Sequence, residues 1–179
     1  VIVGILSFVI SSSFQRNTLI EAADQIVSHI RYTQHLAMSD DVFDPTDATY
    51  FRKRWQIRFT NDSIDNSHRI YWIISDKDKD GNIADTQEYA KNPSNSATIL
   101  SGDSSHTTLR TKELDLTQSY GITTITNNCA PTGGRIFFDA LGRPYRDTVF
   151  PATSSSQNLI TAPCTIVLNN GEMTRTIEI

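Results

Sequence analysis

The sequence lacks the features that define several common classes of protein. Its 179 residues include only two cysteines, too few for a small domain held together by a disulfide framework. The 16 Lys and Arg residues are outnumbered by 20 Asp and Glu residues, and this net charge of −4 argues against a surface built throughout for nucleic acid. Charged residues make up 20% of the chain and apolar residues 38%, which is typical of one folded domain and not of a disordered protein.

Glycine and proline are absent between Gly4 and Pro45, so nothing in this stretch interrupts a helix. We expect one long helix that ends where Asp40, Asp41 and the Asp44-Pro45 pair follow one another. Small and apolar residues recur within it at steps of three and four, which predicts a stripe that packs on the rest of the protein. The stripe comprises Leu19, Ala23, Ile26, Ile30, Thr33 and Ala37.

Long hydrophobic runs are also lacking. Val1–Ile10 is apolar apart from Gly4 and Ser7, and as a helix it would span about 15 Å of a bilayer core about 30 Å thick. The sequence does not begin with Met, so we expect the natural chain to continue upstream and this segment to be the later part of a membrane anchor. Burial in a protein core is the alternative. A secretory signal peptide is disfavoured, because no charged region precedes the run.

After Pro45 the hydrophobic pattern changes from a helical period to the alternation typical of β-strands. Tight turns are predicted at Leu141–Pro144 and Asn169–Gly171. The expected strands are 51–59, 70–74, 97–100, 107–110, 114–116, 122–126, 135–138, 145–149, 165–168 and 174–179. This order predicts an α+β fold in which a long N-terminal helix (1–40) packs on an antiparallel β-sheet or small β-sandwich formed by a globular β domain (41–179).

The first residues, Val1-Ile2-Val3-Gly4-Ile5-Leu6-Ser7, resemble the later part of the N-terminal signature of type IV pilin-like proteins. The predicted hairpin at Ile136–Pro144 and the closing hairpin from Cys164 to Ile179 are similar to those of the H-type minor pseudopilins of type II secretion systems and of related minor pilins. In this family a long helix lies half in the membrane and half on a β-domain, which matches the architecture expected from the residues.

The resemblance implies a structural subunit and not an enzyme. It implies a single-pass protein of the bacterial inner membrane, with the β domain in the periplasm or on the cell surface. Other pilin or pseudopilin subunits would be its partners, and a secreted protein substrate is a further candidate. The helix from Val1 to Ala37 would form the assembly surface, including Leu19, Ala23, Ile26 and Ile30. The sequence motifs are consistent with a protein that is not an enzyme, since the four histidines show no metal-site spacing and no Gly-x-Ser-x-Gly motif is present.

The sharpest local motif is Asp76-Lys77-Asp78-Lys79-Asp80-Gly81-Asn82, which follows the start of an EF-hand calcium loop. Its twelfth position holds Gln87, with Glu88 one residue later, and the residues before it are typical of a strand. We predict a structural Ca²⁺ ion bound by Asp76, Asp78, Asp80, the Asn82 backbone and Glu88. Asp85 is an alternative ligand. Calcium sites known among pseudopilins favour this by analogy. The alternative is an acidic hairpin loop neutralised by its lysines.

Cys129 and Cys164 are the only two cysteines, and two cysteines in an exported domain usually pair. We therefore predict a disulfide that ties the C-terminal hairpin to the loop before Arg135. Two separate buried thiols, as expected in a cytosolic protein, are the alternative.

A cluster of arginines suggests a second function. Arg52, Arg54 and Arg58 would share one face of the expected strand, and Arg143 and Arg146 lie near the Leu141–Pro144 turn. Such a stripe would contact phosphates, so a DNA-binding minor pilin for DNA uptake is the alternative function. A solvated outer face that pairs with nearby acids competes with it. A free-standing calcium-binding exoprotein is a third interpretation.

Overall fold

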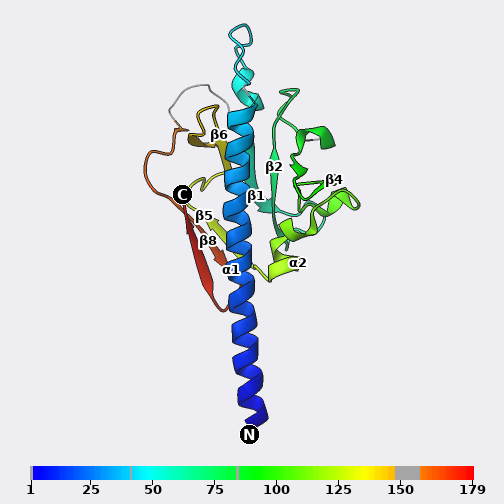
Figure 1. The fold of residues 1–179 in the computed structure, drawn as a ribbon, viewed down its shortest axis with the longest axis vertical. Coiled ribbons are helices and arrows are strands. Elements are labelled where there is room, and N and C mark those ends of the chain that lie inside the picture. The colour runs from blue at the N-terminus through cyan, green and yellow to red at the C-terminus, as the bar shows by residue number, and fades with distance from the viewer. Residues whose placement is uncertain (1, 41, 84, 148–157) are drawn as a thin grey trace.

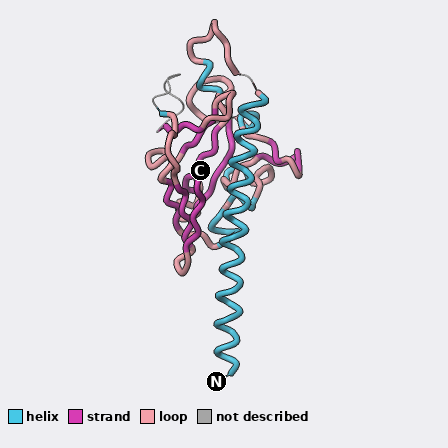
Figure 2. Tube along the Cα trace, turned by 60° about the vertical axis from the view of Figure 1, so that its left-hand side comes forward, coloured by secondary structure: helices cyan, strands magenta, loops and turns pink. Residues whose placement is uncertain are grey.

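The computed structural model describes residues 2–40, 42–83, 85–147 and 158–179, and within these ranges the side chains except those of 2–17 and 147. The fold is α+β, as predicted. Helix α1 (Ile2–Ser39) runs along the β domain with its C-terminal half, while its N-terminal turns extend beyond the domain (Figures 1 and 2). It ends one residue before Asp40, whose carboxylate accepts a hydrogen bond of 3.0 Å from Trp55 Nε1.

The strands form three separate antiparallel sheets. The largest has the order β2-β1-β6-β7, the second β5-β8-β9, and β3 pairs with β4 alone. Helix α1 contacts β1 and β6 of the four-stranded sheet and β8 and β9 of the three-stranded sheet. The bounds are β1 (Gln56–Asn61), β2 (Arg69–Ile74), β3 (Lys91–Asn92), β4 (Asn95–Ile99), β5 (Thr124–Asn127), β6 (Arg135–Phe138), β7 (Pro144–Asp147), β8 (Thr165–Asn169) and β9 (Thr174–Glu178).

The helix stripe forms one side of the main hydrophobic core. Its six predicted members, from Leu19 to Ala37, are all buried. Trp55, Ile57 and Phe59 alternate along β1 and its approach toward the helix, as a strand with one face on the core requires. The opposite face of the sheet carries a smaller apolar cluster formed by Ile70, Trp72, Ile74, Tyr89 and Ile99. Both faces of β2 are therefore covered.

Three of the expected strands differ in the structure. Residues Tyr50–Lys53 form a 3₁₀ helix, so the strand predicted from residue 51 begins at Gln56. The prediction at 107–110 was wrong apart from one bridge between Ile99 and Arg110. The strand predicted at 114–116 is instead a 3₁₀ turn followed by a short helix, α2 (Leu116–Tyr120). The strand predicted at 145–149 is seen as β7, and residues 148 and 149 lie outside the described residues.

Local hydrogen bonds explain why α2 is helical. The carboxylate of Asp115 accepts a 2.9 Å bond from the N–H of Gln118, and Gly121 ends the helix in the left-handed conformation with φ of 69°. These are the signals of a helix start and stop. They override the short apolar run that suggested a strand.

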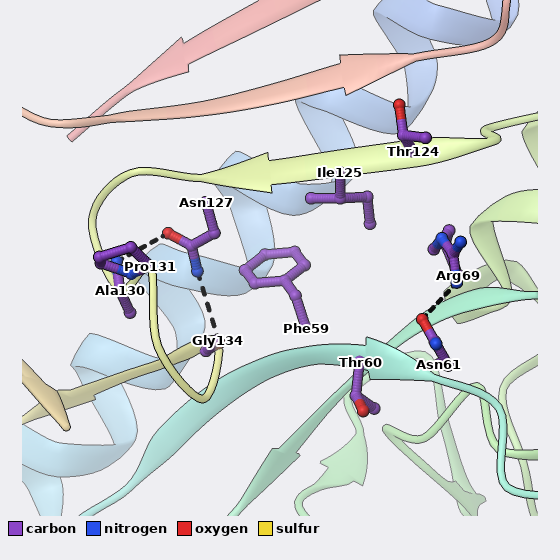
Figure 3. Close-up of a pocket in the computed structure, with 10 residues that line it drawn as sticks. All are labelled: Phe59, Thr60, Asn61, Arg69, Thr124, Ile125, Asn127, Ala130, Pro131 and Gly134. Carbon is purple, nitrogen blue, oxygen red and sulfur yellow. Dashed lines mark hydrogen bonds between the residues drawn. The ribbon is translucent and has the colours of Figure 1, made fainter. Parts of the chain in front are cut away.

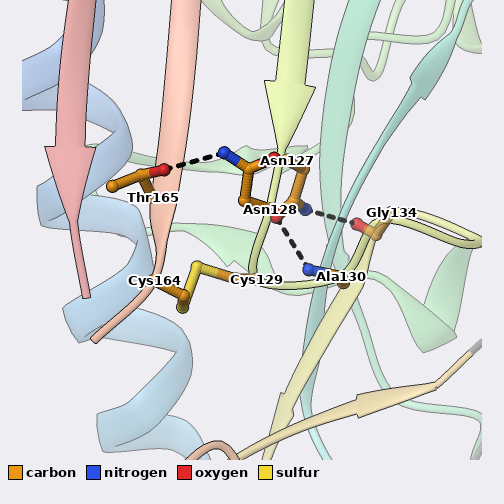
Figure 4. Close-up of a disulfide and its surroundings, with 7 residues drawn as sticks. All are labelled: Asn127, Asn128, Cys129, Ala130, Gly134, Cys164 and Thr165. Carbon is orange, nitrogen blue, oxygen red and sulfur yellow. Dashed lines mark hydrogen bonds between the residues drawn. A yellow bond between two sulfur atoms is a disulfide. The ribbon is translucent and has the colours of Figure 1, made fainter. Parts of the chain in front are cut away.

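The disulfide between Cys129 and Cys164 is present, as predicted (Figure 4). It joins the loop after β5 to the residue before β8, and Asn128 Nδ2 donates a 2.9 Å hydrogen bond to Thr165 Oγ1 beside it. The two cysteines are 35 positions apart, and closing a loop of this size contributes about 4 kcal/mol in the chain-entropy model. The link holds the three-stranded sheet together at one end.

A buried polar network joins helix α1 to the four-stranded sheet. Gln25 Nε2 donates a 2.7 Å hydrogen bond to the hydroxyl oxygen of Tyr71, which lies 2.7 Å from His29 Nδ1. Tyr120 donates to Gln25 Oε1 over 2.8 Å. The Tyr71 hydroxyl and His29 Nδ1 share a hydrogen bond, and burial favours the neutral imidazole. Burial lowers the pKa of His29 from 6.5 to about 4.

Because of this network, we expect the protein to become less stable as the pH is lowered. The unfolded chain binds a proton on His29 below pH 6.5, whereas the folded protein does so only near pH 4. Stability from this group is therefore complete above pH 6.5 and is lost between pH 6.5 and 4, by about 3 kcal/mol. Urea unfolding across this range measures it. The His29→Gln variant, which keeps an acceptor for Tyr71, should lose most of the slope.

His68 provides a control, because its contribution to stability has the opposite dependence on pH. Its hydrogen bond to the Asp115 carboxylate raises its pKa, so its contribution is present below the unfolded value and disappears as pH rises through the folded value. The His68→Gln variant should keep the acid slope. An unchanged acid slope in His29→Gln would contradict the assignment.

Candidate metal site

The candidate metal site is the loop of residues 76–88, which leaves the sheet at the end of β2. The N–H of Ser75 donates a 2.8 Å hydrogen bond to the carbonyl of Glu88, which closes the loop at its base. The hydroxyl of Ser75 also donates to the carbonyl of Lys53 over 2.7 Å. The loop therefore starts and ends at a fixed place on the sheet.

Within the loop, carboxylates accept bonds from backbone N–H groups a few residues further along. Asp76 accepts from Gly81 over 3.2 Å, Asp78 from Asp80 over 3.1 Å, and Asp80 from Asn82 over 2.6 Å. Gly81 has a φ of 78°, which a residue without a Cβ adopts without strain. This is the sharp turn that the glycine at the sixth position of a calcium loop supplies.

The turn brings three carboxylates together. Oxygens of Asp76, Asp78 and Asp80 all lie within 4.8 Å of one another, and the group could hold a metal ion. Asp76 is 1% exposed, and its Oδ1 atom has no hydrogen-bond partner among the described residues. A buried carboxylate oxygen without a partner is costly, and a bound cation would satisfy it.

The two lysines between the acids do not neutralise the group. Lys79 Nζ lies 2.8 Å from Asp47, outside the loop, and Lys77 Nζ lies 5.9 Å from the centre of the Trp55 ring. Lys79 has a φ of 67°, and its carbonyl accepts a 3.3 Å bond from Arg52. The alternative of a lysine-neutralised hairpin loop therefore does not describe this structure.

The charges in the loop repel one another. Burial and the neighbouring charge of Asp78 raise the pKa of Asp76. Burial, followed by the charges of Asp78, Asp76 and Asp80, raises the pKa of Glu88. Glu88 is buried, and its Oε1 accepts a 3.0 Å hydrogen bond from the N–H of Lys77. This bond places the Glu88 side chain beside the start of the motif.

Asn82 and Asp85 complete the predicted set. Asn82, predicted to bind through its backbone carbonyl, is exposed, and its side-chain oxygen accepts a 3.0 Å bond from the N–H of Ile83. Asp85 caps a 3₁₀ turn by accepting from the N–H of Gln87 over 2.9 Å. The structure thus brings together Asp76, Asp78 and Asp80. Glu88 lies close enough that, in addition to burial, their charges raise its pKa.

The four helix residues predicted to take part in assembly lie inside the protein's own core. Leu19, Ala23, Ile26 and Ile30 are between 0% and 8% exposed. They hold the helix on its β domain, so they offer no surface to another subunit, which corrects that part of the prediction.

The five arginines do not form an exposed stripe. Arg54 is 7% exposed, with its guanidinium 5.0 Å from the centre of the Tyr145 ring. Arg52 and Arg58 are half-buried. Arg143 is paired with Asp139 over 2.7 Å, and Arg146 is exposed on β7. Residues from the loops after β2 lie beside Arg58, so the five arginines do not line one exposed surface, and DNA binding stays a prediction.

A polar cavity of about 340 Å³ lies between β1 and β5 (Figure 3). Phe59 and Ile125 face it from the two strands. Three of its polar side chains bond to one another or to the backbone: Arg69 donates to Asn61 and, over 3.1 Å, to the carbonyl of Thr123. Asn127 donates to the carbonyl of Gly134 over 3.4 Å. These groups are already satisfied within the chain.

A second cavity, beside Arg58 and Trp72 on the opposite side of β1, was not predicted from the sequence. The continuous apolar run Ile70–Ile74 was a signal for it, because a strand that is apolar on both faces is covered on both. It did not indicate which residues would cover the second face.

Comparisons with protein-family models, curated proteins and solved structures find no match for this chain. Among the helices of the described residues, none has both the length and the apolar character needed to cross a membrane.

Proposed function

We propose that this protein is a structural subunit of a type IV pilin-like filament, a minor pseudopilin of a type II secretion system or a related minor pilin. The proposal rests on the division of helix α1 into a half that packs on the β domain and turns that extend beyond it. Its C-terminal half is buried in the core of the β domain, and its N-terminal turns extend beyond the domain (Figure 1). The apolar sequence Ile2–Ile10 belongs to the extending end.

An apolar helical segment that leaves its own domain needs another apolar environment. Neighbouring helices in a filament core and the inner membrane before assembly both supply one. Because Leu19, Ala23, Ile26 and Ile30 are used inside the protein, the assembly contacts fall on residues before Leu19 and on the outward side of the helix. The β domain then faces the periplasm or the cell surface.

Position 6 in the apolar segment provides a test of assembly in the native cell. Aspartate at this position should release the protein from the membrane fraction and prevent cross-linking to other helical subunits, because a charge within an apolar contact is costly. The variants are Leu6→Asp and, as a matched control outside the apolar run, Ser12→Asp. Membrane fractionation, followed by photo-cross-linking from position 6, measures the difference.

The melting temperature of both variants should equal that of the unmodified chain, because neither position belongs to the buried stripe. A Leu6→Asp protein that still sediments with membranes and still cross-links to the same subunits would overturn the proposal. Cross-links from position 6 to soluble proteins alone would do the same.

The second part of the proposal is that the loop of residues 76–88 binds Ca²⁺. Its donors are all oxygen atoms, the ligands that Ca²⁺ prefers. The unpartnered Oδ1 of Asp76 and the unneutralised charges of Asp78 and Asp80 support the ion. Glu88 would supply a further carboxylate, and Asn82 its backbone carbonyl. The ion would stabilise the loop by binding only its ordered form.

Calcium should therefore raise the melting temperature, and chelation should reverse the increase. At a free concentration about 100 times the dissociation constant, the gain is about 2.7 kcal/mol, equivalent to a shift of roughly 5–10 °C for a protein of this size. The Asp78→Asn variant should lose this gain and melt no lower than the unmodified chain in chelator, because it removes repulsion. Asp24→Asn, an exposed acid on helix α1, should retain the full gain. An equal calcium shift in Asp78→Asn would refute the site.

A further inference from the structure

A cavity of about 330 Å³ lies on the face of the four-stranded sheet that is turned away from helix α1. Its walls come from β1, β2, the loop of residues 76–88 (here called the metal loop) and the segment around residue 105. The residues that matter here are Arg58, Trp72, Ile83, Tyr89, Asp103 and His106. Its volume is at the lower end of the range of about 300–1,000 Å³ found for small-molecule sites.

Arg58 is a half-buried cation that forms no ion pair with the described residues. The described residues give it no hydrogen bond and no ion pair, and its Nε atom is buried without a partner. Its guanidinium lies 5.3 Å from the centre of the Trp72 ring. Burial lowers its pKa, which reflects the cost of keeping this charge away from water. The contact with the ring offsets part of that cost.

Trp72 adds a second unsatisfied donor to the cavity. The residue is 8% exposed, and its indole Nε1 is buried with no acceptor within the described residues. An indole N–H usually finds a partner when it is buried. Two unpaired donors, one of them charged, therefore occur on neighbouring strands beside one cavity. Both would be satisfied by an anionic oxygen group.

The rest of the cavity has a different character. Asp103 is 5% exposed, and its Oδ1 accepts bonds from Ser63 Oγ over 2.6 Å and from the N–H of Ser105 over 2.8 Å. Tyr89 and His106 form an edge-to-face aromatic pair with centroids 4.9 Å apart. The cavity thus combines donors, a carboxylate acceptor and aromatic walls.

We propose that this cavity binds a small carboxylate that also carries hydroxyl groups, the chemistry of a sugar acid. The ligand carboxylate pairs with the Arg58 guanidinium, the Trp72 side chain turns its buried N–H toward the same carboxylate as the ligand binds, and the ligand hydroxyl groups donate to Asp103. Two arginines, Arg58 and Arg135, and one carboxylate, Asp103, line the cavity, so its charge balance matches a monoanion better than a phosphate dianion. The site is independent of filament assembly, and Gly81–Ile83 of the metal loop form part of its wall.

Glucuronate is the probe that tests this site, with glucose and inorganic phosphate for comparison. The experiment uses the full chain in calcium-containing buffer, and calorimetry gives the affinities. Glucuronate should bind saturably, and glucose should bind at least roughly tenfold more weakly because it lacks the charge. The Trp72 indole N–H resonance should shift with glucuronate, and the Trp55 resonance should not.

Variants separate the two donors from the fold. Arg58→Gln should weaken glucuronate binding by roughly tenfold or more, and Trp72→Phe should weaken it while keeping an aromatic ring. Arg58→Lys should retain part of the affinity. Arg146→Gln, an exposed arginine outside the cavity, is the matched control and should bind normally. Calcium affinity should be unchanged in all four, which distinguishes a failure here from a failure of the metal site.

Three results would overturn the proposal. One is an unshifted Trp72 resonance at saturating glucuronate in the unmodified chain, which does not depend on any variant folding. Another is equal binding of glucose, or tighter binding of phosphate. The last is a glucuronate affinity that neither Arg58→Gln nor Trp72→Phe reduces.

Discussion

The docking of helix α1 against two separate sheets is the contact on which the rest of the structure depends. The four-stranded and three-stranded sheets share no strand, and the helix contacts both. Ile26 and Ala22 are fully buried there. Each sheet alone would leave an apolar face in water, and the helix covers both faces at once. The Cys129–Cys164 disulfide adds a covalent restraint within the three-stranded sheet and the loop before β6.

The candidate metal site and the cavity beside Arg58 lie on the other side of the four-stranded sheet. The helix fixes one face, and the loops that follow β2 cover the opposite face with a smaller apolar cluster. The metal loop starts from the buried end of β2, so its base is fixed while its tip turns outward. The cavity beside Arg58 and Trp72 lies between this loop and the sheet. The helix and the candidate sites therefore occupy opposite faces of the same sheet.

Features governed by neighbouring residues could be predicted from the sequence. The end of α1 followed from the absence of Gly and Pro and from the acids after it, and the β8–β9 hairpin followed from Asn169–Gly171, where Gly171 has a φ of 93°. The grouping of the Asp76, Asp78 and Asp80 carboxylates could be predicted from their spacing of two residues in the sequence. Helix α2 was also encoded locally, by Asp115 and Gly121, but its short apolar run was interpreted as a strand.

Features that depend on distant segments could not be predicted in the same way. Alternation placed Arg54 and Arg58 on the face away from the helix, and this is where they lie. Whether that face is exposed depends on segments tens of residues away, and periodicity carries no information about them. The directions of Lys77 and Lys79 likewise depend on Trp55 and Asp47, outside the loop.

Native-state hydrogen exchange along helix α1 tests the central role of its docking most directly. If residues 22–37 form the shared core of both sheets, their slowest amides should exchange only through global unfolding, with the same free energy as the slowest amides of β1 and β8. Exchange of these helix amides at a clearly lower free energy, while both sheets remain protected, would show that the helix leaves a stable β domain and would contradict the account.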